Sequence, residues 1–122
     1  MRAETSSELF HSYLQRAVRA LAAYEPERVI VFGSYARGDF DAYSDLDLVI
    51  IKETDRRFVE RLVEAGSYLD LPISVDVFVY TPAEFQSMVE EGNPFIERVQ
   101  REGRVIYERS SNSKKMDGPG AA

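Results

Sequence analysis

Two short apolar runs on either side of a polar, glycine-containing segment constrain this chain more than any other feature. The runs lie in residues 28–34, RVIVFGS, and 45–53, DLDLVIIKE, and both are rich in β-branched residues. They predict two β-strands, and the turn-forming residues between them, YARGDFDAYS, predict a loop. The second run contains Asp45 and Asp47, two like charges in what otherwise resembles a buried strand. A fold that buries these strands must also complement those charges.

The hydrophobic pattern elsewhere predicts alternating helices and strands within a single domain. In residues 6–24 apolar side chains recur in pairs every four residues, as in an amphipathic helix, and Pro26 is expected to stop it. The later elements are expected to be a helix in 55–70 that Gly66 weakens, a strand at 73–80, helices at 82–92 and 95–103, and a strand at 104–108. The domain covers residues 1–109, and residues 110–122, which lack periodicity, are predicted to form a disordered tail.

Composition excludes several classes of function. The chain has no cysteine, which excludes thiolate metal sites and a cysteine nucleophile, and its one histidine, His11, is interpreted as a surface residue of the first helix. Fifteen Lys and Arg against twenty-one Asp and Glu give a net charge of −6, so direct nucleic-acid binding is not expected. No apolar run approaches the roughly 18 residues that cross a bilayer, and the N-terminus has no signal-peptide pattern. We therefore expect a soluble, cytoplasmic protein without a membrane partner.

Carboxylates occur in two of the predicted strands. Because side chains alternate across a strand, Asp45 and Asp47 share one face of the second strand, while Asp76 lies on one face of the third. If these strands are neighbours in register, the three carboxylates converge, and their repulsion must be relieved by an arginine or a divalent cation. Oxygen ligands without histidine or cysteine suit Mg²⁺ or Mn²⁺, and two such ions about 3.5–4 Å apart can clamp a nucleotidyl transfer. A lone D-x-D pattern, by contrast, is usually an exposed strand edge or a turn cap.

The segment before these carboxylates has the chemistry of a phosphate-binding loop. Gly33 lets the backbone approach a ligand, Ser34 adds a hydroxyl donor, and Arg37 adds positive charge where a strand ends and a helical turn would begin. Standing alone, the segment would be interpreted as an ordinary turn. This segment stands directly before a carboxylate pair, and a third carboxylate follows in a later strand. Together they predict a site for a nucleoside triphosphate and metal.

The combined motif resembles that of a known family. Gly33-Ser34, ten further residues and then Asp45-Leu46-Asp47 resemble the G-S-x10-D-x-D signature of the DNA polymerase β-type nucleotidyltransferase superfamily. The longer block GSYARGDFDAYSDLDLVI is similar in particular to the minimal nucleotidyltransferases, the MNT proteins. The resemblance covers residues 28 to about 80 and implies an α/β (α+β) fold, in which a small mixed sheet of about four strands carries helices.

The resemblance also implies a role for each residue of the motif. The implied nucleotide- and phosphate-binding residues are Gly33, Ser34 and Arg37, and the implied metal ligands and catalytic residues are Asp45, Asp47 and Asp76. In this family the third carboxylate can act as the base toward the incoming hydroxyl. Two Mg²⁺ ions, or Mn²⁺, and ATP are the implied cofactors and substrate.

The resemblance implies an enzyme that acts on a partner protein. Minimal members are commonly encoded beside a helical HEPN protein, so the expected reaction is transfer of AMP from ATP to a tyrosine hydroxyl of a HEPN toxin. Larger relatives carry a second, helical domain for the base or acceptor, and this chain ends too soon for one. Two alternatives stay open: transfer to a small-molecule hydroxyl, with the missing wall supplied by another chain or a homodimer, and neutralisation of a toxin by binding alone.

Overall fold

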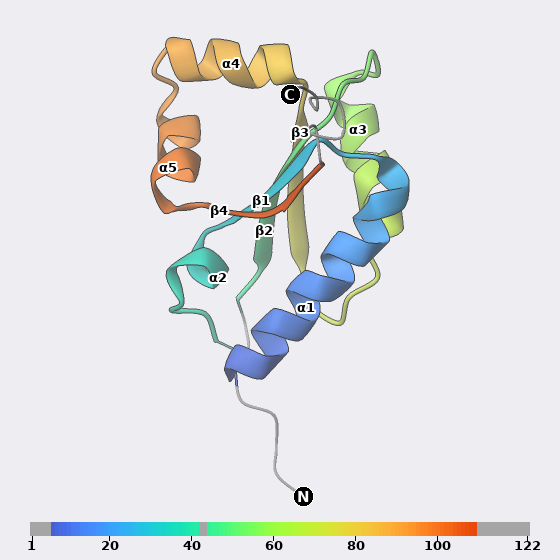
Figure 1. The fold of residues 1–122 in the computed structure, drawn as a ribbon, viewed down its shortest axis with the longest axis vertical. Helices are drawn as coiled ribbons and strands as arrows, with labels where there is room; N and C mark the ends of the chain where they lie inside the picture. The colour runs from blue at the N-terminus through green and yellow to red at the C-terminus, as the bar shows by residue number, and fades with distance from the viewer. Residues whose placement is uncertain (1–5, 42–43, 110–122) are drawn as a thin grey trace, which may run out of the picture.

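The computed structural model of this chain describes residues 6–41 and 44–109, and the predicted tail, residues 110–122, lies outside the described residues. In chain order the elements in Figure 1 are α1 (Ser6–Leu21), the 3₁₀ turn η1 (Ala22–Tyr24), β1 (Arg28–Phe32), α2 (Ser34–Arg37), β2 (Leu46–Ile51), α3 (Phe58–Tyr68), β3 (Val75–Tyr80), α4 (Pro82–Glu90), α5 (Pro94–Glu102) and β4 (Arg104–Glu108). The predicted alternation of helices and strands is confirmed.

The strands form one mixed sheet in the order β3-β2-β1-β4. β1 pairs antiparallel with both β2 and β4, whereas β2 and β3 are parallel. A parallel pair needs a crossover connection, and α3 provides it. The expected small mixed sheet of about four strands that carries helices is therefore confirmed.

Helices cover both faces of this sheet (Figure 1). The core beneath α1 and α3 includes Leu14, Leu21, Val29, Leu48 and Ala65, and the core beneath α4 and α5 includes Ile30, Val49, Phe85, Ile96 and Val99. β1 and β2 lie in the middle of the sheet and are covered on both sides, which is why their sequences are nearly continuous apolar runs. No helix in the described part of the chain is long and apolar enough to cross a membrane.

Element boundaries differ from the sequence prediction at a few places. The first helix ends at Leu21 and continues only as a 3₁₀ turn, after which Glu25 adopts a left-handed conformation (φ 61°). Gly66 does not interrupt α3, which runs on to Tyr68. Asp45 precedes β2 instead of lying within it, and the predicted loop contains the short helix α2.

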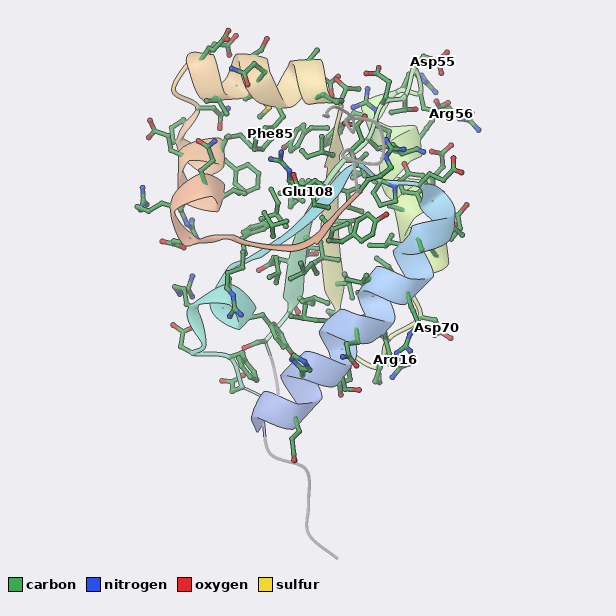
Figure 2. All side chains as sticks on the ribbon, viewed as in Figure 1. Arg16, Asp55, Arg56, Asp70, Phe85 and Glu108 are labelled. Carbon is green, nitrogen blue, oxygen red and sulfur yellow. The ribbon has the colours of Figure 1, made fainter. Side chains whose placement is uncertain are left out.

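Polar contacts hold the helices on the sheet. Arg61 of α3 is buried and donates from Nη1 to the carbonyl oxygen of Val79 (3.2 Å) and to Glu84 of α4 (2.6 Å). Near the far end of α3, Arg16 of α1 donates to the carbonyl oxygen of Asp70 at 3.0 Å, and these two residues lie side by side in Figure 2. Neither arginine belongs to the predicted site, and their contacts tie α1 and α3 to other parts of the fold.

Candidate active site

Asp47 and Asp76 lie next to each other on neighbouring strands. They are register partners in the parallel β2–β3 pair, so both side chains project from the same face of the sheet. Their carboxyl groups are close enough for the charge of Asp76 to raise the pKa of Asp47. The expected convergence of strand carboxylates is therefore present for this pair.

Burial and like charge raise the pKa of Asp47 to about 6. Loss of solvation is the largest cause, followed by the charge of Asp76, the hydrogen bond between the two groups and the charge of Asp45, while Arg37 opposes the rise. Two carboxyl groups this close share a proton at low pH and repel each other once both are ionised. At neutral pH the pair is therefore an anionic site that a cation would stabilise.

Gly33 brings the loop after β1 into contact with Asp47. Its backbone has φ 75° and ψ −153°, a region that essentially only glycine occupies. A Cβ atom at this position would collide with Oδ2 of Asp47 and would lie 3.3 Å from its Cγ. Glycine is therefore required here both by the backbone conformation and by the carboxylate that fills the space of its missing side chain.

Tyr35 anchors the short helix α2 that follows. Its side chain is only 3% exposed, and its ring stacks on Phe40 with the centroids 4.6 Å apart. Because Tyr35 points into the core, Ser34 is left half-buried and Arg37 exposed on the same short helix. The predicted phosphate-binding side chains are thus presented outside the core, directly after Gly33.

Two carboxylates hold Arg37. Its Nε donates to Oδ2 of Asp39 at 3.2 Å, and its Nη1 lies 3.5 Å from Oε1 of Glu102, at the end of α5. The hydrogen bond that Arg37 donates to Asp39 is the largest cause that raises the pKa of Arg37, and Glu102 adds to it. In turn, the charge of Arg37 lowers the pKa of Asp47. The guanidinium and the acidic pair therefore lie within electrostatic reach of one another.

Asp45 lies at the margin of this arrangement. It is exposed, one residue before β2 begins, and its charge raises the pKa of Asp47. Among residues 6–41 and 44–109, no group of three acidic or histidine side chains is close enough to form a metal site by itself. The structure thus brings together two of the three predicted carboxylates, and Asp45 as a third ligand stays a prediction.

Sequence reasoning missed an aromatic wall beside the carboxylates, formed by Phe32, Phe78 and Phe95. Phe32 is the register partner of Asp47, and Phe78 follows Asp76 by two residues on the same face of β3. Ring centroids are 5.4 Å apart for Phe32 and Phe95 and 5.3 Å apart for Phe78 and Phe95. Strand alternation does place Phe78 on the face of Asp76, but no local signal places α5, which contributes Phe95.

The donor set of this site fits a hard divalent cation. Asp47 and Asp76 offer only carboxylate oxygens, which Mg²⁺ and Mn²⁺ prefer, and a cation would relieve their repulsion. Because Asp47 contacts Gly33, an ion held by this pair would lie beside the loop that is predicted to bind phosphate. Arrangements of this kind suit chemistry on a triphosphate.

Comparisons with known proteins agree with this chemistry. The family model of the nucleotidyltransferase domain matches residues 13–107. A Methanocaldococcus jannaschii protein named as a protein adenylyltransferase is 32% identical over 81 residues, which cover 66% of this chain and 78% of that one. MntA from Haemophilus influenzae, also named as a protein adenylyltransferase, is 40% identical over 67 residues, 52% of this chain and 59% of its own. A Sulfolobus solfataricus crystal structure described as a nucleotidyltransferase shares the fold, with a TM-score of 0.62 at 19% identity over 88% of this chain and 91% of that chain.

Proposed function

Because this chain belongs to the nucleotidyltransferase domain family and is an MNT-type member of it, we propose that it transfers AMP from ATP to a hydroxyl group of a partner protein. One observation carries the proposal: Asp47, the register partner of Asp76, touches the loop after β1 at Gly33. Nucleotidyl transfer needs cation-binding carboxylates and phosphate-binding groups at one place. The names of the relatives from M. jannaschii and H. influenzae support a protein as the acceptor.

Substrate binding is divided between the loop and the carboxylates. Mg²⁺ or Mn²⁺ held by Asp47 and Asp76, with Asp45 beside them, would neutralise charge on the triphosphate and on the attacking oxygen. Gly33 lets the phosphates approach the backbone of the loop, and the hydroxyl of Ser34 donates to them. The guanidinium of Arg37 adds a donor and a positive charge on the same side.

Asp76 is the residue best placed to accept the proton of the acceptor hydroxyl. It is exposed, whereas Asp47 is half-buried against Gly33, so an incoming hydroxyl can reach Asp76 more readily. As the proton moves to Asp76, the hydroxyl oxygen forms a bond to the α-phosphorus. The bond between that phosphorus and the oxygen bridging to the β-phosphate breaks, and pyrophosphate leaves with the electron pair.

The proposed acceptor is a tyrosine hydroxyl of a helical HEPN-type toxin, which would make this chain an antitoxin that works by adenylylation. The test incubates the purified protein with Mg²⁺, ATP labelled at the α-phosphate and the protein encoded beside it. Label on a tyrosine of that protein, located by peptide mass spectrometry, is the expected result. Label on a small molecule would show that the acceptor is a small-molecule hydroxyl instead of a protein. Neutralisation of the toxin without any transfer would show that the protein acts by occlusion and not by adenylylation.

A further inference from the structure

Glu102, at the end of α5, lies close to three cationic side chains. Its carboxylate lies 3.5 Å from Arg37 of α2, 3.7 Å from Arg98 and 3.9 Å from Arg101. Only 27% of its side chain is exposed, against 41% for Arg37. Glu102 is therefore the fixed member of these pairs, and Arg37 is the side chain that it holds.

The backbone around Glu102 is wedged against the central strand. The next residue, Gly103, donates its N–H to the carbonyl oxygen of Val99 at 2.7 Å. A Cβ at Gly103 would collide with that oxygen and would lie 2.8 Å from Cγ2 of Ile30 and 3.3 Å from the carbonyl oxygen of Val31. Such close packing of α5 on β1 leaves the end of the helix little freedom, so the position of Glu102 is set by the core.

Asp39 and Glu102 hold Arg37 at two different atoms, Nε and Nη1. An arginine side chain has many rotamers, and binding an anion with a free one costs conformational entropy. Holding the guanidinium at two atoms removes much of that freedom in advance. Nη2 makes no hydrogen bond to the described residues, so it is left to donate to a ligand. The charge of Arg37 also lowers the pKa of Asp47, so the guanidinium acts on the same site.

We propose that Glu102 is a positioning residue for nucleotide binding: it fixes Arg37 in the orientation in which the guanidinium meets the triphosphate. The assignment of the ligand rests on the proposed function, whereas the contact between Glu102 and Arg37 does not. Glu102 acts through Arg37 and touches neither the substrate nor the metal.

Binding of Mg²⁺ with an ATP analogue that carries a methylene bridge between the α- and β-phosphates tests this role by calorimetry, without any acceptor. Glu102→Ala is expected to raise the Kd about threefold to fivefold, the range of an exposed ion pair, and Glu102→Gln by less, because its amide oxygen still accepts a hydrogen bond. Glu97→Ala changes the charge of the same helix equally and should leave the Kd unchanged. In an Arg37→Ala background, Glu102→Ala should have no further effect. Equal or tighter binding by Glu102→Ala, or the same loss without Arg37, would overturn the proposal.

A second readout needs no nucleotide. Nitrogen-15 relaxation of the Arg37 Nε–H group should show an ordered side chain in the wild type and in Glu97→Ala, and a more mobile one in Glu102→Ala. If the wild type fails to bind the analogue while this ordering is present, the proposed function fails and the contact between Glu102 and Arg37 stands. If Arg37 is equally mobile in all three proteins, Glu102 does not position it.

Discussion

Replacing Asp47 with asparagine is expected to stabilise the metal-free protein at pH 7 while abolishing nucleotidyl transfer. The pKa of Asp47 is raised from 3.8 to about 6, because its carboxyl is desolvated and faces Asp76. A rise of about two units corresponds to about 3 kcal/mol against the ionised form in the folded protein, at about 1.36 kcal/mol per unit. Since the side chain is only half-buried, solvent screening reduces this to about 1–2 kcal/mol. Asparagine removes the charge and keeps a donor for the hydrogen bond to Asp76.

The pH dependence gives the sign of the effect. The folded protein holds the proton of the Asp47 carboxyl more tightly than the unfolded chain does. The free-energy cost of ionising Asp47 in the folded protein is therefore absent below about pH 4 and complete above about pH 7. The free energy of unfolding of the wild type should therefore fall as the pH rises through this range, relative to that of Asp47→Asn.

Urea denaturation in a chelator, followed by circular dichroism at pH 4.5, 5.5 and 7, measures this difference. In a parallel thermal unfolding experiment at pH 7, the midpoint of Asp47→Asn should exceed that of the wild type by about 4–10 °C. Asp55→Asn is the matched control, because Asp55 is exposed in the loop between β2 and α3, away from the site (Figure 2). The reasoning is refuted if Asp47→Asn is no more stable than Asp55→Asn, or if the wild type and Asp47→Asn respond to pH alike.

Three further predictions concern the loop, the metal and the scaffold. Gly33→Ala should lose about 1–3 kcal/mol of stability and bind the ATP analogue more weakly, because alanine strains the backbone and its Cβ clashes with Asp47. An unchanged urea midpoint and an unchanged Kd would contradict this prediction. A chelator should abolish AMP transfer, and Mg²⁺ or Mn²⁺ should restore it to the wild type but not to Asp47→Asn; transfer that survives metal removal would exclude the proposed site. Arg61→Ala should lower the free energy of unfolding, measured by urea denaturation, by about 2–4 kcal/mol, because it removes hydrogen bonds to Glu84 and Val79. The control Arg57→Ala, at the exposed start of α3, should lower it by less than about 0.5 kcal/mol. Equal losses would show that the buried network is unimportant.

Much of the fold follows from local pattern, because the two central strands are buried on both sides and carry continuous apolar runs. The same alternation that places Asp47 and Asp76 on sheet faces predicted that they would meet if their strands were neighbours in register, and the structure shows that they are register partners. Alternation could not predict where the strand begins. Asp45 lies one residue before β2 and is exposed, although the pattern places it on the same strand face as Asp47.

Contributions from distant segments could not be predicted. Phe95 reaches the site because α5 packs on the same sheet face, and Glu102 meets Arg37 because Gly103 lets α5 end against β1. Neither residue belongs to a recognisable motif, and both depend on tertiary packing between elements more than 60 residues apart along the chain. The roles of Gly33, Ser34 and Arg37 toward phosphate remain predictions.

The most direct test of the central claim compares AMP transfer by three proteins: the wild type, a variant with Asp47→Asn and Asp76→Asn, and the charge-matched variant with Asp55→Asn and Asp70→Asn. Each is incubated with Mg²⁺, ATP labelled at the α-phosphate and the proposed partner protein. If the carboxylate pair beside Gly33 is the catalytic centre, the wild type and the control variant transfer label at similar rates, and the Asp47/Asp76 variant is slower by about a hundredfold or more. Similar rates for all three proteins would contradict the account.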